Sequence, residues 1–340
     1  MANQTTPSRS FNTVKSSNRQ ARRARKQTSR VILLAIFAVV AALVLSCFVF
    51  IVCSIVNTLR GDAPDDGKTP PVSTSGTPNG DAARPVVYQS LTQSNFDVHK
   101  GILVIVNETY AYEFPASGTG LKKIMENRLL YNDTSNTFMV NGNNSSWMLE
   151  EVALDALNQM MLKHYELFED GSVSVSSAYR TEADQAALGS SIQPGHSDHH
   201  TGLCVALMTY GQGPLESSHW VYNNCYKYGF IVRYPDVKEE ITGVSNYTHC
   251  FRYVGIPHAT YINNNNLCME EYVQLLQGYT KDAPLAITGA DGHRYEVYYT
   301  AASNGDITTI QVPQNYVYTV SGDNIGGFIV TVHLDEPANA

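Results

Sequence analysis

The longest apolar stretch of the chain covers residues 31–56, where only small residues interrupt the hydrophobic run. Its length exceeds the ~20 residues that cross a bilayer as a helix. It is also longer than the apolar core of a cleavable secretory signal, which has ~7–15 residues. We therefore predict a retained transmembrane helix at residues 31–56. A lipoprotein-like processing site at Cys47 is the weaker alternative, because the apolar run continues beyond it.

The chain after this span changes from a linker to patterned segments. Residues 57–86 are rich in Pro, Gly, Ser, Thr and Asp, a composition typical of a flexible linker. Residues 101–107 form a short apolar run, which predicts a strand. Apolar residues at three- and four-residue steps predict a helix over 149–168. Alternation over 173–177 predicts a half-buried strand, and Thr181 is expected to cap a short helix.

The second half of the chain divides into a mixed part and an all-strand part. We predict strands at 203–207 and 251–254, and helices at 218–228 and 269–277 that each end before a glycine. From about residue 282, aromatic and β-branched segments alternate with turn residues, as in a small β module. The fold class is therefore α+β with an appended all-β module. The predicted division is a basic arm at 1–30, the transmembrane helix at 31–56, the linker at 57–86, the α+β domain at 87–280 and the β module at 281–340.

The distribution of charge predicts how this chain is oriented across the membrane. Residues 1–30 contain eight basic residues and no acidic ones, and positive flanks stay on the cytoplasmic side of a span. We therefore expect a single-pass cell-membrane protein with a cytoplasmic N-terminus and an extracytoplasmic main domain. Without the arm's eight basic residues, the formal charge falls from −8 to −16. Nucleic acid is not expected as a partner of so acidic a domain.

Four cysteines lie in the predicted extracytoplasmic domain: Cys204, Cys225, Cys250 and Cys268. An even number of cysteines in an oxidising compartment is typical of disulfide pairing, and four cysteines allow three pairings. Sequence spacing does not choose among them. Buried free thiols are the alternative, because cysteine also packs as a small apolar residue.

A histidine-rich turn stands before the predicted strand at 203–207. It presents His196, Asp198, His199 and His200 within five positions, and neutral imidazoles are good zinc ligands. A solvated loop is the alternative, because a zinc site needs three or four convergent ligands.

Four segments give this turn a context. They are SAYRTEADQ at 177–185, SDHHTGLCVA at 197–206, YGFIVRYP at 228–235 and ITGVSNYTHCFRYVG at 241–255. In this order they resemble the VanY-type D-alanyl-D-alanine carboxypeptidases, over roughly residues 87–278. The resemblance implies a zinc-peptidase core of antiparallel sheet and helices that trims terminal D-Ala from peptidoglycan stem peptides. The β module also resembles appendages of some family members.

The chain departs from the family pattern at the positions that carry the chemistry. The pattern has two zinc ligands in S-x-H-x-x-G-x-x-x-D, then a general base and a third ligand in E-x-x-H. Here His199 keeps the first ligand, but Ala206 stands at the second and has no donor atom. Tyr247 stands at the general-base position and Cys250 at the third ligand.

The resemblance therefore implies a degenerate member of the family. His199 and Cys250 remain as metal ligands, but two protein ligands are too few for a stable catalytic zinc site. A tyrosine with a pKa near ~10 is also a poor base at neutral pH. We expect zinc to bind weakly or not at all. Substitute ligands are the alternative, with His196, Asp198, His200 and His249 as candidates.

The resemblance also implies a pairing for the cysteines. The two ligand-bearing strands lie close together in the family fold, and Cys204 shares a strand face with Ala206. A Cys204–Cys250 disulfide would then close the vacant metal position, leaving Cys225 and Cys268 as the second pair.

The family's substrate-binding positions are better conserved in this chain than its metal-binding positions are. Arg180, Gln185 and Ser197 stand at positions that hold the substrate's backbone and terminal carboxylate, although an Arg180 pairing with Glu182 or Asp184 is the structural alternative. We interpret the chain as a non-catalytic relative that binds a stem peptide or another cell-wall partner. The alternatives are an active zinc carboxypeptidase with substitute ligands, and a disulfide-stabilised surface scaffold.

Overall fold

A computed structural model describes residues 84–115, 120–144 and 146–338. The predicted arm, transmembrane helix and nearly all of the linker lie outside the described residues. No helix in the described part of the chain is both long and apolar enough to cross a bilayer.

A six-stranded sheet forms the centre of the α+β part. Its order is β10-β11-β8-β7-β5, and β9 extends β8 at one end. All of these pairs are antiparallel except β5 with β7. The strands are β5 (Met139–Val140), β7 (Val173–Ser177), β8 (Cys204–Thr209), β9 (Gly213–Pro214), β10 (Phe230–Val232) and β11 (Cys250–Tyr253).

Helix α3 (Glu151–Phe168) packs against this sheet, as its periodicity predicts. Leu154, Leu157 and Met161 lie fully buried in one apolar cluster with Val175 of β7 and Val205 of β8. The other helices are α2 (Ile124–Asn127), α4 (Glu182–Ala187), α5 (Trp220–Asn224), α6 (Glu239–Thr242), α7 (Ile256–Asn264) and α8 (Met269–Leu276). Short strand pairs flank them: β2 (Leu121–Lys123) with β6 (Met148–Glu150), and β3 (Leu130–Tyr131) with β4 (Ser135–Asn136).

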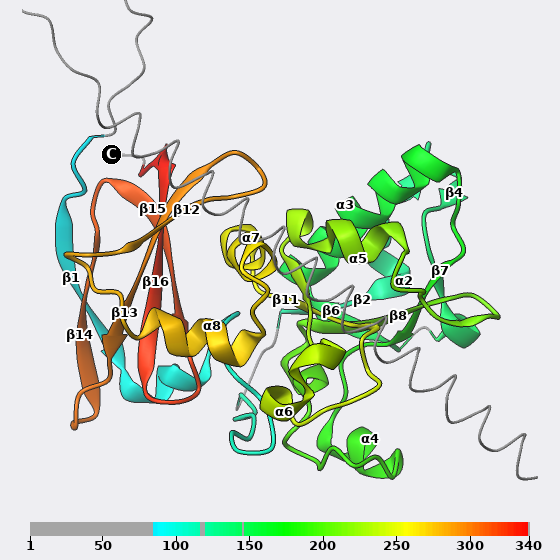
Figure 1. Cartoon of the computed structure of the whole chain (residues 1–340), viewed down its shortest axis with the longest axis horizontal. Coiled ribbons are helices and arrows are strands. Elements are labelled where there is room, and N and C mark those ends of the chain that lie inside the picture. The colour runs from blue at the N-terminus through cyan, green and yellow to red at the C-terminus, as the bar shows by residue number, and fades with distance from the viewer. Residues whose placement is uncertain (1–83, 116–119, 145, 339–340) are drawn as a thin grey trace, which may run out of the picture. The chain divides into compact units, whose positions relative to one another are not determined.

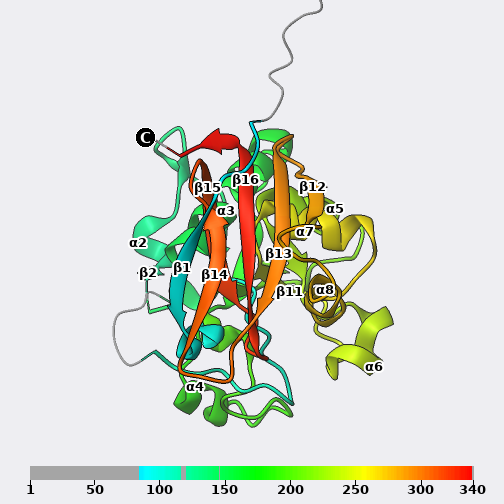
Figure 2. The same cartoon turned by 90° about the vertical axis from the view of Figure 1, so that its left-hand side faces the viewer.

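The C-terminal strands form the predicted all-β region. Four of them follow the antiparallel order β12-β13-β16-β15, and β14 pairs with β1 near the start of the described chain. Figure 2 looks onto these strands. Their bounds are β1 (Tyr88–Ser94), β12 (Leu285–Thr288), β13 (Arg294–Ala301), β14 (Ile307–Pro313), β15 (Tyr316–Gly322) and β16 (Gly327–Pro337). Residues 88–94, assigned from sequence to the α+β domain, thus complete the β module.

The α+β part and the β module share an apolar cluster. Ile262 of α7 and Val273 of α8 are buried together with Val297 of β13 and Ile329 of β16. Figure 1 shows α7 between the strands of the module and the central sheet, and Figure 2 shows α8 beside β13. The described residues after 80 accordingly form one compact unit.

The prediction of a strand at residues 101–107 is wrong, and the reason lies in its partners. The segment begins with a turn and is buried only over residues 103–106, and side chains satisfy much of its backbone in place of a neighbouring strand. Leu103 N–H donates to Ser321 Oγ at 2.9 Å. The carbonyls of Ile102 and Val104 accept from Arg252 at 3.1 and 3.2 Å. An apolar run shows that a segment is buried, but not what its backbone binds.

Candidate functional site

Two paired strands bring the family's second and third ligand positions together. In the β8–β11 ladder Cys250 lies directly opposite Ala206, and Arg252 lies opposite Cys204. The turn that carries His199 is a short 3-10 helix, η3 (Asp198–Thr201), which ends at Gly202 with φ 69°. A Cβ at Gly202 would approach Leu121 Cδ2 to 2.7 Å, so only glycine allows this turn to lead directly into β8.

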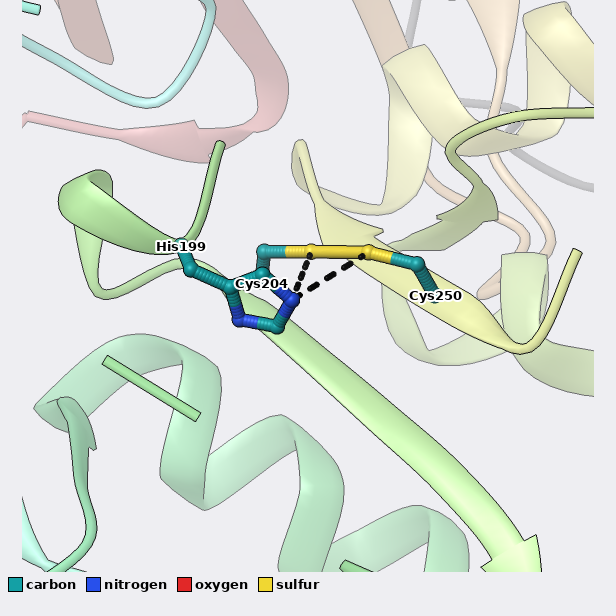
Figure 3. Close-up of side chains that lie close together, drawn as sticks. All are labelled: His199, Cys204 and Cys250. Atoms are coloured by element: carbon teal, nitrogen blue, oxygen red, sulfur yellow. Dashed lines mark hydrogen bonds between the residues drawn. A yellow bond between two sulfur atoms is a disulfide. The ribbon is translucent and has the colours of Figure 1, made fainter. Parts of the chain in front are cut away.

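The sulfurs of Cys204 and Cys250 are joined in a disulfide, with their Cα atoms 6.7 Å apart. Figure 3 shows this bond between the two strands, with His199 beside it. The expected Cys204–Cys250 pairing is therefore confirmed.

The expected second pairing is wrong, because Cys225 and Cys268 are both free and buried. Cys225 packs in the apolar cluster around α3, whereas Cys268 caps the first turn of α8. Burial raises the pKa of Cys225 to about 12 and that of Cys268 to about 11, so both thiols stay protonated at neutral pH. For Cys225 and Cys268, the alternative prediction of buried free thiols is therefore the correct one.

His199 is 1% exposed, and both of its ring nitrogens have partners. Nδ1–H donates to the Ala178 carbonyl at 2.8 Å, which leaves Nε2 without a proton. Nε2 then accepts from the Tyr247 hydroxyl at 2.7 Å. It also lies 4.0 Å from Cys204 Sγ and 3.9 Å from Cys250 Sγ. Burial, together with the nearby Arg180 charge, holds the pKa of His199 well below its usual value, so the ring is neutral.

In the disulfide form the donor set does not fit the zinc that the family implies. With Cys204 and Cys250 joined, neither sulfur is a thiolate, and Ala206 contributes no donor at the second position. Tyr247 does not replace the missing base, because burial raises the pKa of its hydroxyl above the ordinary value and its proton is already directed at His199. Among the described residues, the hydrogen-bond partners of His199 include no carboxylate.

Arg180 lies next to this closed metal position. Its guanidinium donates to Ser177 Oγ at 3.0 and 2.7 Å and to Gln185 Oε1 at 2.9 Å. A longer contact of 3.4 Å reaches the Tyr247 hydroxyl. Within the described residues Arg180 forms no salt bridge, so the structural alternative of a pair with Glu182 or Asp184 does not hold. Asp184 accepts instead from Thr181, which caps α4 as predicted.

The other candidate residues have structural partners. Ser197 is 1% exposed, and its Oγ accepts from the His199 backbone N–H at 3.4 Å. Gln185 is equally buried and donates to the Ile192 carbonyl at 2.9 Å. His196 donates through Nδ1 to the Asn107 carbonyl at 2.7 Å. Both ring nitrogens of His200 are bonded to backbone groups.

Asp198 belongs to a buried charge network that the sequence interpretation missed. Its two carboxylate oxygens accept from Arg233 and Arg252, and all three side chains are fully buried. Arg233 also donates to both oxygens of Glu270, at 2.9 and 2.7 Å. The only signal in the sequence was that both arginines fall within the matched segments 228–235 and 241–255.

A cavity of about 390 Å³ lies beside the disulfide's apolar surroundings. Tyr234 and Val244 pack around Cys204 and Cys250 and also line this cavity. Asn107, Gln193 and His196 supply polar groups to its walls. The space is therefore large enough for part of a peptide and offers hydrogen-bonding partners.

Known proteins match this chain in sequence. Residues 146–256 match the family model of VanY, D-alanyl-D-alanine carboxypeptidase. A D-alanyl-D-alanine carboxypeptidase of Enterococcus faecium is 30% identical over 260 residues, covering 72% of this chain and 79% of the relative. Another, from Enterococcus faecalis, is 48% identical over 82 residues, which are 24% of this chain and 31% of the relative.

A solved structure is similar over most of the described residues. The D,D-dipeptidase VanXYg, solved with a D-Ala-D-Ala phosphinate analogue, is 26% identical with a TM-score of 0.62. The match covers 73% of this chain and 99% of that protein. The chain belongs to the VanY-type D-alanyl-D-alanine carboxypeptidase family.

Proposed function

We propose that this protein binds D-alanine-terminated stem peptides of peptidoglycan without hydrolysing them. Its relatives are D-alanyl-D-alanine carboxypeptidases, and the related D,D-dipeptidase VanXYg was solved with a D-Ala-D-Ala phosphinate analogue. Under this proposal the protein binds the family's class of ligand but does not catalyse the family's reaction.

The proposal rests on Arg180, whose guanidinium is held in place but has no ionic partner among the described residues. Ser177 and Gln185 hold its guanidinium in place, and both are neutral. No carboxylate among the described residues forms an ion pair with it. A fixed guanidinium without a counter-charge is suited to a terminal carboxylate, because its planar fork can donate two parallel hydrogen bonds.

The atoms beside Arg180 support the proposed absence of hydrolysis. A family peptidase needs a metal to polarise the scissile carbonyl and a base to activate water. In the disulfide form two of the potential donors are covalently joined, and the Tyr247 hydroxyl hydrogen-bonds the remaining one, His199. The bound peptide would meet a neutral, closed surface there.

We further propose that residues 31–56 anchor the protein in the cell membrane, with the described domain on the outside. The basic arm at 1–30 supports this orientation, because basic flanks stay cytoplasmic. Residues 57–86 would then act as a spacer between the membrane and the peptide-binding domain.

Calorimetric titration of the oxidised protein with a stem pentapeptide ending in D-Ala-D-Ala tests the proposal. Arg180→Ala should weaken binding about 10- to 100-fold, the effect of losing a charged hydrogen bond worth about 1.5–3 kcal/mol. Arg294→Ala is the matched control, since Arg294 pairs with Asp335 in the β module. The pentapeptide amide, which lacks the terminal carboxylate, should bind weakly to the unsubstituted protein and be insensitive to Arg180→Ala.

Two results would overturn the proposal. Catalytic release of D-alanine by the oxidised protein would show that the chain is an active carboxypeptidase. Equal binding by the parent and Arg180→Ala, or no binding by either, would favour a surface scaffold that does not bind peptide through Arg180.

A further inference from the structure

We propose that Cys204 and Cys250, once reduced, form with His199 a binding site for a thiophilic divalent cation such as Zn²⁺. The disulfide and the metal are then mutually exclusive occupants of one position. This inference does not depend on peptide binding, which concerns the oxidised form.

The distances among the three donors support the site. His199 Nε2, Cys204 Sγ and Cys250 Sγ all lie within 4.8 Å of one another. Tetrahedral zinc with Zn–N near 2.1 Å and Zn–S near 2.3 Å separates nitrogen from sulfur by roughly 3.6 Å. The observed separations of 4.0 and 3.9 Å differ from that by a few tenths of an ångström. Rotation of the two cysteine side chains is enough to close this difference.

The distance between strands β8 and β11 is compatible with a metal bound by Cys204 and Cys250. Two thiolates on one tetrahedral zinc lie roughly 3.8 Å apart, so the sulfurs must separate when their bond is reduced. The Cα atoms of Cys204 and Cys250 are 6.7 Å apart, near the upper end of the usual disulfide range of roughly 4.4–6.8 Å. Strands β8 and β11 can therefore keep their register in both states.

His199 is already oriented as a metal ligand. Its Nδ1–H is held by the Ala178 carbonyl at 2.8 Å, and Nε2 faces the two sulfurs. Metal-binding histidines typically have such a carbonyl partner on the second nitrogen, which sets both the tautomer and the ring orientation.

Cys204 is the residue that makes the set complete. It precedes Ala206 by two residues on β8, so the two share a strand face. The family's His, Asp and His donors thereby become His199, Cys204 and Cys250. All three are buried, and a set of one imidazole and two thiolates selects Zn²⁺ over Mg²⁺ or Ca²⁺.

The exchange between the two states balances with a dithiol as reductant. The dithiol transfers two electrons and two protons to the Cys204–Cys250 disulfide, yielding two thiols and the dithiol's own disulfide. Metal binding then displaces the two thiol protons. A disulfide oxidant reverses the sequence and releases the cation.

Tyr247 competes with the cation for His199. Its hydroxyl donates to Nε2 at 2.7 Å, so it must move before that nitrogen binds a metal. The metal form would still lack a carboxylate base at this position. We therefore assign the cation a structural or regulatory part and not a hydrolytic one.

The test uses the full chain, reduced with a phosphine without oxygen and titrated with Co²⁺ and then Zn²⁺. One equivalent of Co²⁺ should produce thiolate-to-metal absorption in the near ultraviolet, and Zn²⁺ should abolish it. The oxidised chain should show neither signal. Cys204→Ser, Cys250→Ser and His199→Ala should each weaken binding at least on the order of 100-fold, and Tyr247→Phe should strengthen it.

The double substitution Cys225→Ser/Cys268→Ser is the matched control, because it removes the two other described thiols and should leave the signal intact. Near-ultraviolet circular dichroism verifies that each reduced variant is folded. A folded, reduced chain that binds no Co²⁺ would overturn the proposal. So would a signal that survives Cys204→Ser/Cys250→Ser.

Discussion

The position of the family's metal and the buried charge network around Asp198 differ in how they tolerate the replacement of a residue. At the metal position Ala206 and Cys250 face each other across β8 and β11, where the family has two ligands for one ion. A metal there joins the two strands, and the Cys204–Cys250 disulfide joins the same strands. One cross-link can thus substitute for another without disturbing the sheet.

The Asp198 network offers no such substitution. Arg233 and Arg252 are fully buried and share the carboxylate of Asp198, which is the only carboxylate paired with Arg252 among the described residues. Removing one partner leaves a charge unpaired in a medium of low dielectric constant, which costs several kcal/mol. The comparison indicates that the family's ligand positions have changed where one cross-link can replace another, and that the buried charge network has been kept where no such replacement is available.

The largest expected effect comes from restoring the lost chemistry. If the protein is non-catalytic as proposed, Ala206→Asp, Tyr247→Glu and Cys250→His together should convert it into one that binds zinc and releases D-alanine from a stem pentapeptide. The variant that keeps Tyr247 should bind zinc but release D-alanine at least ~10²-fold more slowly, because it lacks the base. Zinc binding without any release in the complete variant would show that the Arg180 side is also altered.

Asp198→Asn should have the largest effect on stability. It removes the negative charge that the two buried arginines share, leaving Arg252 without a counter-charge among the described residues, and should lower the free energy of unfolding by about 3–5 kcal/mol. Urea unfolding followed by fluorescence measures this change. Lys123→Gln is the control, because it breaks only an exposed pair with Glu126 and should cost at most about 1 kcal/mol. Equal effects of both substitutions would contradict the contrast between the two regions.

Loss of the disulfide should have a somewhat smaller effect. Cys204→Ala/Cys250→Ala removes a cross-link between residues 46 positions apart and should cost about 2–4 kcal/mol. Addition of a reductant should destabilise the parent but not the variant. Cys225→Ala is the comparison, since this buried thiol forms no disulfide. If the reductant leaves the parent unchanged, the bond does not contribute as a cross-link.

The smallest expected effect is the pH dependence contributed by Glu270. Burial alone would raise the pKa of this carboxyl, but the Arg233 charge and hydrogen bonds outweigh it and lower the pKa below its ordinary value. A carboxyl with a lowered folded-state pKa stabilises the fold above its unfolded pKa of ~4.3. That contribution is lost as the pH falls through the folded pKa.

Denaturant unfolding at several pH values tests this contribution. The parent should exceed Glu270→Gln in stability by about 1–3 kcal/mol at pH 7, and the difference should shrink below pH ~4. A difference that stays constant between pH 7 and pH 3 would assign the stabilisation to packing and not to charge.

Local patterns in the sequence were sufficient for several elements. The apolar spacing over 149–168 predicted α3, the alternation over 173–177 predicted β7, and Thr181 was identified as the cap of α4. These features depend on neighbours within a few residues, so they can be read along the chain. The run at 101–107 misled for the same reason, because its backbone partners come from Ser321 and Arg252, which are far away in sequence.

By itself the sequence determined the family and the positions at which this chain departs from it. Ala206, Tyr247 and Cys250 were identified by counting along the motifs. Only the tertiary structure decided that Cys225 and Cys268 stay apart and that Asp198 binds two buried arginines. It also decided that His199, Cys204 and Cys250 converge. The reason is physical: a motif specifies residue types in order, whereas pairing and ligation depend on distances that exist only once the strands have docked.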